Sequence, residues 1–186
     1  MVFKKKNSVV LFWLNRFGFV FLLCIVFSCK EEAPSMEEMK EYTGPLMEID
    51  SLETLYSDSS VLRVRFNTGK QLEYVNGDKE FLNGVKIEFF NEKGESEAVL
   101  TSQKGYQDKQ SAIYRVIGDV VVQNLKEKKS LHTEKLFWDS KSKKIYTTEF
   151  VKIQTPKEVL TGEGLEAAQD FSKYKITKPT GIFLLE

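Results

Sequence analysis

The sequence predicts an all-β protein built from many short antiparallel strands. Three observations lead to this prediction. Apolar and polar residues alternate with a period of two, turn-forming residues separate these stretches, and apolar positions recur every 31 residues. A period of two is typical of half-buried strands, because successive side chains of a strand point to opposite faces. After the N-terminal segment, no window of eleven or more residues carries the apolar stripe of a helix.

Residues 1–28 predict a lipoprotein signal peptide. The positive charge of this segment lies in residues 1–16, and the apolar run 17–27 that follows is too short to cross a bilayer alone. The run ends in 26-VFSC-29, where a small residue precedes Cys29. This resembles the bacterial lipobox, which is cut before a cysteine that is then acylated, so Cys29 is the predicted lipidation site. The alternative is an uncleaved anchor helix with a chance cysteine.

Residues 29–45 predict a flexible tether that leads to a single β domain over residues 46–186. The tether is polar and acidic and contains two prolines. The whole chain has 27 basic and 27 acidic side chains, and four of the basic ones lie in residues 1–28. Removal of the signal peptide therefore leaves 23 basic and 27 acidic side chains, a net charge of −4. That balance disfavours nucleic acid as a partner.

Strand-like stretches follow one another through residues 46–186. The clearest is 61–67, where Leu62, Val64 and Phe66 alternate with two arginines. Further strands are predicted at 85–90, 120–124, 145–153 and 173–176. Turns are predicted between strands at Asn76-Gly77, Asn83-Gly84, Glu92-Lys93-Gly94 and Pro156-Lys157.

The 31-residue repeat predicts stacked β units of two to three strands. Shifting the chain by 31 residues aligns Tyr114 with Ile145 and Ile176, Val120 with Val151 and Ile182, and Val122 with Ile153 and Leu184. No unit of this length buries its own apolar face, so the units must stack. Stacking gives an open sheet with two end strands rather than a closed barrel. The alternative is a sandwich whose strands are regularly spaced by chance.

Several segments between residues 60 and 180 resemble LptC, the membrane-anchored periplasmic component of the lipopolysaccharide export machine. The resemblance rests on 84-GVKIEFFNEKGESEAVLTS-102, 117-IGDVVVQN-124, 131-LHTEKLFWD-139, 144-KIYTTEFVKI-153 and 161-TGEGLEAAQDFSKYKI-176. It implies an open, twisted antiparallel β-jelly-roll shaped like a V. It also implies non-catalytic transfer: lipopolysaccharide is accepted from an inner-membrane ABC transporter and passed to an LptA-like protein. The chain departs from the best-known members, which keep a transmembrane helix, by having Cys29.

A lipid-binding groove requires apolar side chains on one face of many strands, because an unpaired buried charge is unfavourable. The candidate groove residues are Leu62, Val64, Phe66, Ile87, Phe89, Val120, Val122, Val151 and Ile153. Packing against each other as a core is the alternative for each of them. The resemblance implies that the C-terminal edge pairs with the LptA-like partner by adding a strand. The residues assigned to this edge are Gly162, Gly164, Ile182, Phe183 and Leu184.

Other residues that could carry chemistry favour structural roles. His132, the only histidine, is predicted to point outward from a strand, and no nucleophile and base are placed beside each other. Asp108, Asp139 and Asp170 recur with the repeat, which places them in equivalent turns. A carboxylate ladder that holds a cation is the alternative. The sequence thus predicts no enzyme, no resident metal and no cofactor.

The predicted location is the periplasmic face of the inner membrane, through the lipid anchor. The segment 29-CKEE-32 raises an alternative, because an acidic run after a lipidated cysteine resembles a signal for export to the cell surface. The competing function is therefore a β-rich surface or periplasmic lipoprotein that binds protein or glycan, located at the outer membrane.

Overall fold

Ten antiparallel strands joined by short turns make up the part of the chain that the structure describes. The structure is a computed structural model, and it describes residues 42–184. The signal peptide, Cys29 and nearly all of the tether lie outside the described residues. The strands are β1 (Pro45–Asp58), β2 (Val61–Tyr74), β3 (Lys79–Phe90), β4 (Ser96–Ser102), β5 (Lys104–Gln107), β6 (Ile113–Asn124), β7 (Lys129–Asp139), β8 (Lys144–Gln154), β9 (Glu158–Ala168) and β10 (Tyr174–Leu184).

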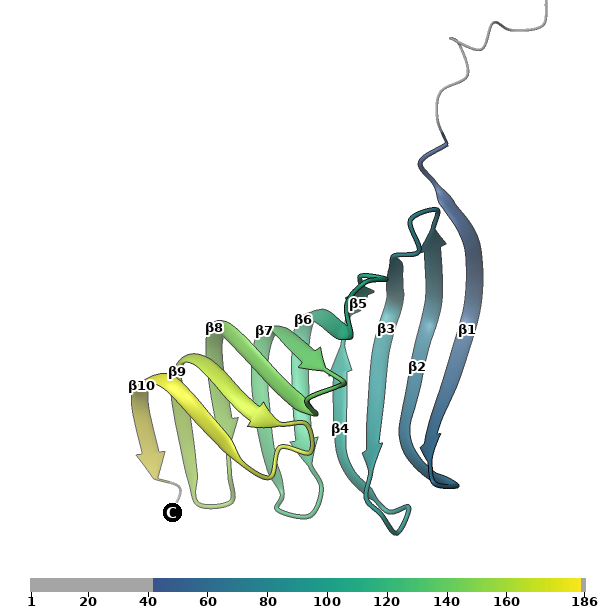
Figure 1. Ribbon diagram of the computed structural model, residues 1–186. Coiled ribbons are helices and arrows are strands. Elements are labelled where there is room, and N and C mark those ends of the chain that lie inside the picture. The colour runs from purple at the N-terminus through teal and green to yellow at the C-terminus, as the bar shows by residue number, and fades with distance from the viewer. Residues whose placement is uncertain (1–41, 185–186) are drawn as a thin grey trace, which may run out of the picture. The chain divides into compact units, whose positions relative to one another are not determined.

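The strands form one sheet in which neighbours in sequence are neighbours in space. The order is β1-β2-β3-β4-β6-β7-β8-β9-β10, and β5 pairs with β3 and β6 beside β4. Among the described residues β1 pairs only with β2 and β10 only with β9, and β1 and β10 lie at opposite ends of the sheet (Figure 1). The predicted all-β fold is therefore confirmed, as is the prediction of an open sheet with two end strands.

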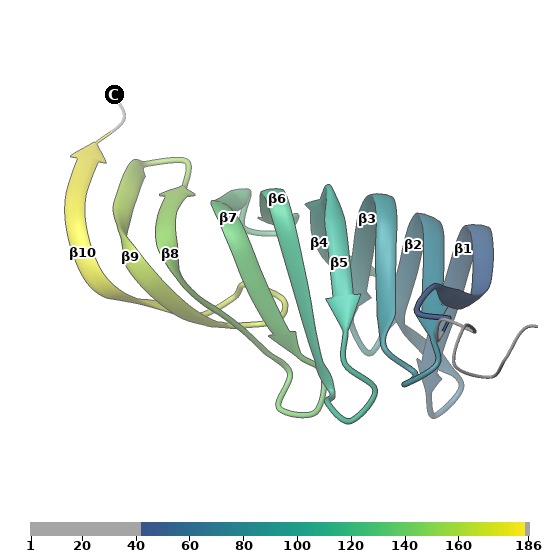
Figure 2. The same cartoon turned by 90° about the horizontal axis from the view of Figure 1, so that it is seen from above.

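The sheet folds over on itself because most of its strands are interrupted near their middle. Register shifts occur in β2, β6, β7, β8 and β10, and β4 and β5 are two halves of one strand separated at Gln103. Gly118, Asp119 and Gly164 adopt positive φ at these sites, which is the backbone of a β-bulge. Bulges bend strands, and the resulting curvature is visible in Figure 2.

From β2 to β10, with β4 and β5 counted as one strand, each strand therefore contributes one half to each of two layers. We call the front layer the half that contains residues 70–74, 79–82, 104–107, 113–117, 135–139, 144–147, 163–168 and 174–178. The back layer contains residues 61–68, 85–90, 96–102, 120–124, 129–133, 150–154, 158–162 and 181–184. The inner faces of the two layers enclose a single buried apolar cluster.

The turn predicted at Asn83-Gly84 is wrong, because these residues form a bulge inside β3. Both residues have positive φ, 61° for Asn83 and 92° for Gly84. Residues with positive φ occur in hairpin turns and in β-bulges alike, so the residue types favour both equally. Gly69 on β2 lies so close that a Cβ there would stand 2.7 Å from the Asn83 carbonyl oxygen. Close approach to a neighbouring strand keeps the chain extended, so β3 runs on from Lys79 to Phe90. The turns at residues 76–77, 92–94 and 156–157 are confirmed.

The repeat is confirmed in the arrangement of the strands. β6 begins at Ile113, β8 at Lys144 and β10 at Tyr174, and each opens an equivalent unit. One of the three aspartates lies in the turn that precedes each of these strands or, for Asp139, directly before that turn. In each turn the carboxylate accepts the backbone N–H two residues further on, at 2.8 Å for Asp108 and 2.9 Å for Asp139 and Asp170. The predicted role of these residues in equivalent turns is therefore confirmed.

Candidate functional site: the apolar interior and the edge strands

The nine predicted groove residues lie on the inner face of the back layer. Cross-strand pairing explains this, because Phe66 pairs with Ile87 and Ile87 with Leu100, and directly opposed residues share a face. Ile87, Val120, Val122, Val151 and Ile153 are 0% exposed, whereas Leu62 and Val64 are half-buried. The middle of the predicted groove is thus packed as core, and its N-terminal end is accessible.

Aromatic side chains fill the space between the two layers. Trp138 of the front layer contacts Phe89 of the back layer edge-on, with ring centroids 5.3 Å apart. Tyr114 stacks on Trp138 at 5.0 Å, and Phe81 meets Phe66 at 4.7 Å. Aromatic pairs of this geometry contribute about 0.5–1.5 kcal/mol beyond the area they bury. Apolar contacts therefore hold the two layers together in the middle of the interior.

The inner face becomes exposed where the sheet ends at β1. Met47, Leu52 and Tyr56 are paired with the inner-face side of β2, and Met47 and Tyr56 are 44% and 62% exposed. Leu52 is half-buried beside Thr68. The apolar interior thus continues onto an edge strand with no further strand to cover it among the described residues.

The inner face is exposed in the same way at β10. Ile182 pairs with Leu160, which pairs with Ile153 of the core, so these side chains share the inner face. Ile182 is 66% exposed and Leu184 is 80% exposed, whereas Leu160 is half-buried. The backbone of Phe183 pairs with that of Val159 on β9. The residues predicted at the C-terminal edge from Ile182 onward do lie on the edge strand.

Gly162 and Gly164, assigned to the same edge, lie one strand further in. Both belong to β9, which has β8 on one side and β10 on the other. A Cβ at Gly162 would stand 2.5 Å from the carbonyl oxygen of Lys178, and Gly164 has φ +76°. These glycines allow the close approach and the bend of β9 that position β10.

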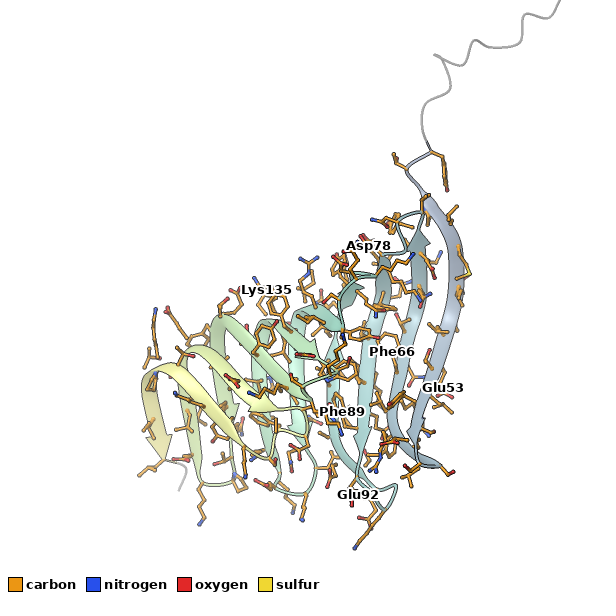
Figure 3. The ribbon with its side chains drawn as sticks, viewed as in Figure 1. Glu53, Phe66, Asp78, Phe89, Glu92 and Lys135 are labelled. Atoms are coloured by element: carbon orange, nitrogen blue, oxygen red, sulfur yellow. The ribbon has the colours of Figure 1, made fainter. Side chains whose placement is uncertain are left out.

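The outer face of the sheet is polar and laced with ion pairs. Arg65 contacts Glu88 at 3.2 Å and Lys70 contacts Glu48 at 2.9 Å, each across neighbouring strands. Figure 3 shows Phe66 and Phe89 within the fold and Glu53 and Glu92 at its periphery. The Arg65–Glu88 pair is partly buried, whereas the Lys70–Glu48 pair is exposed, and exposed pairs contribute little to stability.

His132 lies as expected, and the adjacent aromatic residues Phe137 and Trp138 lie on opposite faces of the sheet. His132 is exposed and shares a hydrogen bond with Ser130 at 3.2 Å. Trp138 is buried, while the adjacent Phe137 faces outward and stacks on Tyr146 at 5.2 Å. The hydroxyl of Ser142 donates to Asp139, and this bond, with the backbone N–H donors of the turn, holds the pKa of the Asp139 carboxyl below its ordinary value.

Sequence reasoning missed the inner-face residues of β1 at one end of the interior, and Phe171 and Lys129, which close it at the other end. The inner-face apolar residues Met47, Ile49 and Leu52 of β1 are spaced by two and then by three residues, because the chain bends at Ser51, where φ is 57°. That break hides the period of two. Phe171 and Lys129, which are both buried, gave no periodic signal because they lie at a turn and at a strand end.

Within residues 42–184 no group of three or more histidine, cysteine, aspartate or glutamate side chains is arranged to hold a metal ion. The same part of the chain contains no helix that is long and apolar enough to cross a membrane.

An open antiparallel sheet, folded over an apolar interior that is exposed at both edge strands, defines an open β-jelly-roll protein with a continuous apolar inner face. Comparison with protein families matches residues 19–178 to the family described as lipopolysaccharide-assembly, LptC-related, and the chain belongs to this family. Membership assigns it a role in lipopolysaccharide transport and assembly within the envelope Lpt system. A comparison with curated proteins finds no match.

Proposed function

We propose that this protein transfers lipopolysaccharide without catalysis, taking it from an inner-membrane ABC transporter and passing it to an LptA-like protein. The acyl chains lie against the inner face, and the sugar and phosphate groups stay in water. The observation that carries the proposal is that the apolar inner face runs from β1 to β10 and is exposed on both edge strands. Transfer in one direction needs an apolar surface where lipid enters and another where it leaves, and both edge strands carry exposed apolar side chains.

The chemistry of the interior supports an acyl ligand. Among the buried residues of the described chain Lys129 carries the only charged side chain, and its ammonium is paired with Glu127 at 2.7 Å. Most of the other buried positions are aliphatic or aromatic, and the few uncharged polar ones, such as Thr68, Asn124 and Thr147, are hydrogen-bonded within the protein, which suits a hydrocarbon ligand. Leu62 and Val64, which are half-buried near β1, are the groove residues that an incoming chain meets first.

The membrane anchor is part of the same proposal. An acylated Cys29 holds the β domain at the periplasmic face of the inner membrane through residues 29–45, and this keeps β1 near the transporter. Substituting Cys29 with alanine is expected to release the protein from the membrane fraction, and intact-mass analysis of the mature N-terminus reports acylation. Recovery only in the outer membrane would contradict the transfer role and favour a surface lipoprotein that binds protein or glycan.

Photocrosslinking in cells tests the lipid pathway. A photoreactive residue at Val64, on the inner face, is expected to capture lipopolysaccharide. One at Arg63 is the matched control, because it is the next residue of β2 and its side chain points to the opposite face. Equal capture from both positions, or none from Val64, would contradict an interior pathway.

The C-terminal edge is tested separately. Strand addition relies on backbone hydrogen bonds, so deletion of residues 182–186 is expected to abolish capture of the LptA-like partner. Replacing only the side chains of Ile182 and Leu184 with serine keeps the backbone and should weaken capture less. Unchanged capture after the deletion would place the partner elsewhere.

A further inference from the structure

The turn between β9 and β10, residues 169–173, inserts a side chain into the interior. Phe171 is 0% exposed and belongs to the buried cluster between the layers. Its backbone adopts φ 55°, a left-handed conformation that is unfavourable for a bulky residue. The turn is closed by a hydrogen bond from the Phe171 N–H to the Ala168 carbonyl at 2.8 Å. Burial of the ring thus holds a strained turn in place.

Lys129 fastens this turn to the opposite layer. Its Nζ donates to the carbonyl oxygen of Ser172 at 2.8 Å, although the two residues are 43 positions apart. The ammonium also lies 5.4 Å from the centroid of the Phe171 ring and 5.3 Å from that of Tyr174. Lys129 begins β7 in the back layer, so the bond crosses from the back layer to a front-layer turn.

Asn124 makes a second bond across the same gap. Its Nδ2 donates to the carbonyl oxygen of Asp170 at 2.8 Å, and its Oδ1 accepts the N–H of Glu127 at 2.7 Å. The second bond fixes the orientation of the amide, so the donor faces the β9–β10 turn. Asn124 ends β6 and Lys129 starts β7, and both donors therefore come from one hairpin.

The other turns of the front layer bond along their own rim. The N–H of Ser140 donates to the Ala112 carbonyl at 3.2 Å, and the N–H of Lys109 donates to Asp78 at 3.1 Å. The β9–β10 turn makes such a bond too, from Gln169 to the Lys143 carbonyl at 3.0 Å. The β9–β10 turn is also bonded to the back layer through Asn124 and Lys129. It joins β9 to β10, the strand at the C-terminal edge.

We propose that the β9–β10 turn is a latch that closes the interior before β10 and opens when lipid passes towards that edge. When the turn opens, an acyl chain fills the space that the Phe171 ring leaves, so the interior stays filled by an apolar group. The two crossing bonds end on backbone carbonyls, which water satisfies when the turn swings out. Release also relieves the left-handed backbone at Phe171. The latch rests on the proposed transfer function and adds its regulation.

Crosslinking at two matched positions tests the latch. Val64 on β2 and Leu160 on β9 are both half-buried residues packed against the core, each one strand in from an edge. The probe is cellular lipopolysaccharide, and the readout is the ratio of capture at Leu160 to capture at Val64. Lys129→Met keeps an apolar stem but loses the crossing bond, and Lys126→Met in the same hairpin is the control because Lys126 is exposed.

Loss of a hydrogen bond from a charged donor shifts a two-state equilibrium by about tenfold or more. The capture ratio is therefore expected to rise by about tenfold in Lys129→Met and to stay unchanged in Lys126→Met. An unchanged ratio with normal capture at Val64 overturns the latch and leaves the transfer function intact. Absence of capture at both positions overturns the transfer function itself.

Hydrogen exchange on the intact protein gives a readout that needs no substitution. Purified lipopolysaccharide is expected to speed amide exchange in residues 169–173 and to leave the turn at residues 140–143 unchanged. Should Lys129→Met fail to fold, Phe171→Leu weakens the same turn, and the crosslinking ratio is expected to rise in the same direction. Slower exchange in residues 169–173 would overturn the latch.

Discussion

Truncation of Ile153 is expected to destabilise the protein far more than a larger truncation on the same strand. Ile153 is 0% exposed and is paired with Leu131 and Leu160 on the inner face. Ile153→Ala removes three carbons, which amounts to about 2.4 kcal/mol of transfer free energy at roughly 0.8 kcal/mol each. The cavity left behind brings the expected loss in the free energy of unfolding to about 3–4 kcal/mol.

Phe150→Ala is the matched control. Phe150 lies three residues earlier on β8 and is 57% exposed, so its truncation is expected to change the free energy of unfolding by about 0.5 kcal/mol or less. With a urea dependence of about 2 kcal/mol per molar, the midpoint should fall by roughly 1.5–2 M for Ile153→Ala and hardly move for Phe150→Ala. Urea unfolding followed by circular dichroism measures both. Equal midpoints would refute the packed interior and would mean that Ile153 lines an open lipid cavity.

Three further predictions concern the bend of β9, a repeat turn and a buried phenol. Gly162→Ala brings a Cβ against the Lys178 carbonyl and should lower the free energy of unfolding by about 1–3 kcal/mol and speed amide exchange in β10. Gly94→Ala meets no neighbouring atom, and its positive φ of 78° strains only the β3–β4 turn, so β10 exchange should stay unchanged, and equal exchange in both variants would argue against the clash. Because the pKa of Asp139 is lowered in the folded state, its stabilising effect is complete above about pH 4 and is lost as pH falls through the native value. NMR titration should locate that value, and Asp139→Asn should flatten this part of the acid unfolding profile. Burial raises the pKa of Tyr114, so its contribution is complete below about pH 10 and is lost as pH rises through the native value. Denaturant unfolding at alkaline pH should show a shallower loss in Tyr114→Phe, and an identical slope would contradict the assignment.

The core residues of the back layer were predictable because they obey a local rule. Val120 and Val122, like Val151 and Ile153, stand two residues apart on strands that stay extended between bulges. Local alternation then decides which side chains share a face, whatever the rest of the chain does. The aspartate turns were predictable for a similar reason, since a carboxylate and a backbone N–H two residues away need no distant partner.

The closure of the interior was not predictable in this way. Phe171 is buried and Lys129 is buried beside it because two turns 43 residues apart meet across the layers, and no local period encodes that meeting. The bulge at Asn83-Gly84 was not predictable for the same reason. Positive φ fits a turn as well as a bulge, and only the position of the neighbouring strand decides between them.

The sequence by itself determined that this chain is all-β, repeats every 31 residues and carries apolar residues on one face of its strands. Those properties follow from the alternation of side chains and from turn chemistry, which act within a few residues. The tertiary structure alone decided which of the apolar residues are sealed and which are accessible. Ile182 is accessible because it lies on an edge strand, Val64 is half-buried one strand in from the other edge, and Ile153 is sealed because the bent strands bring a second layer over it. Accessibility depends on contacts between distant segments, so it is fixed only once the sheet has folded over itself.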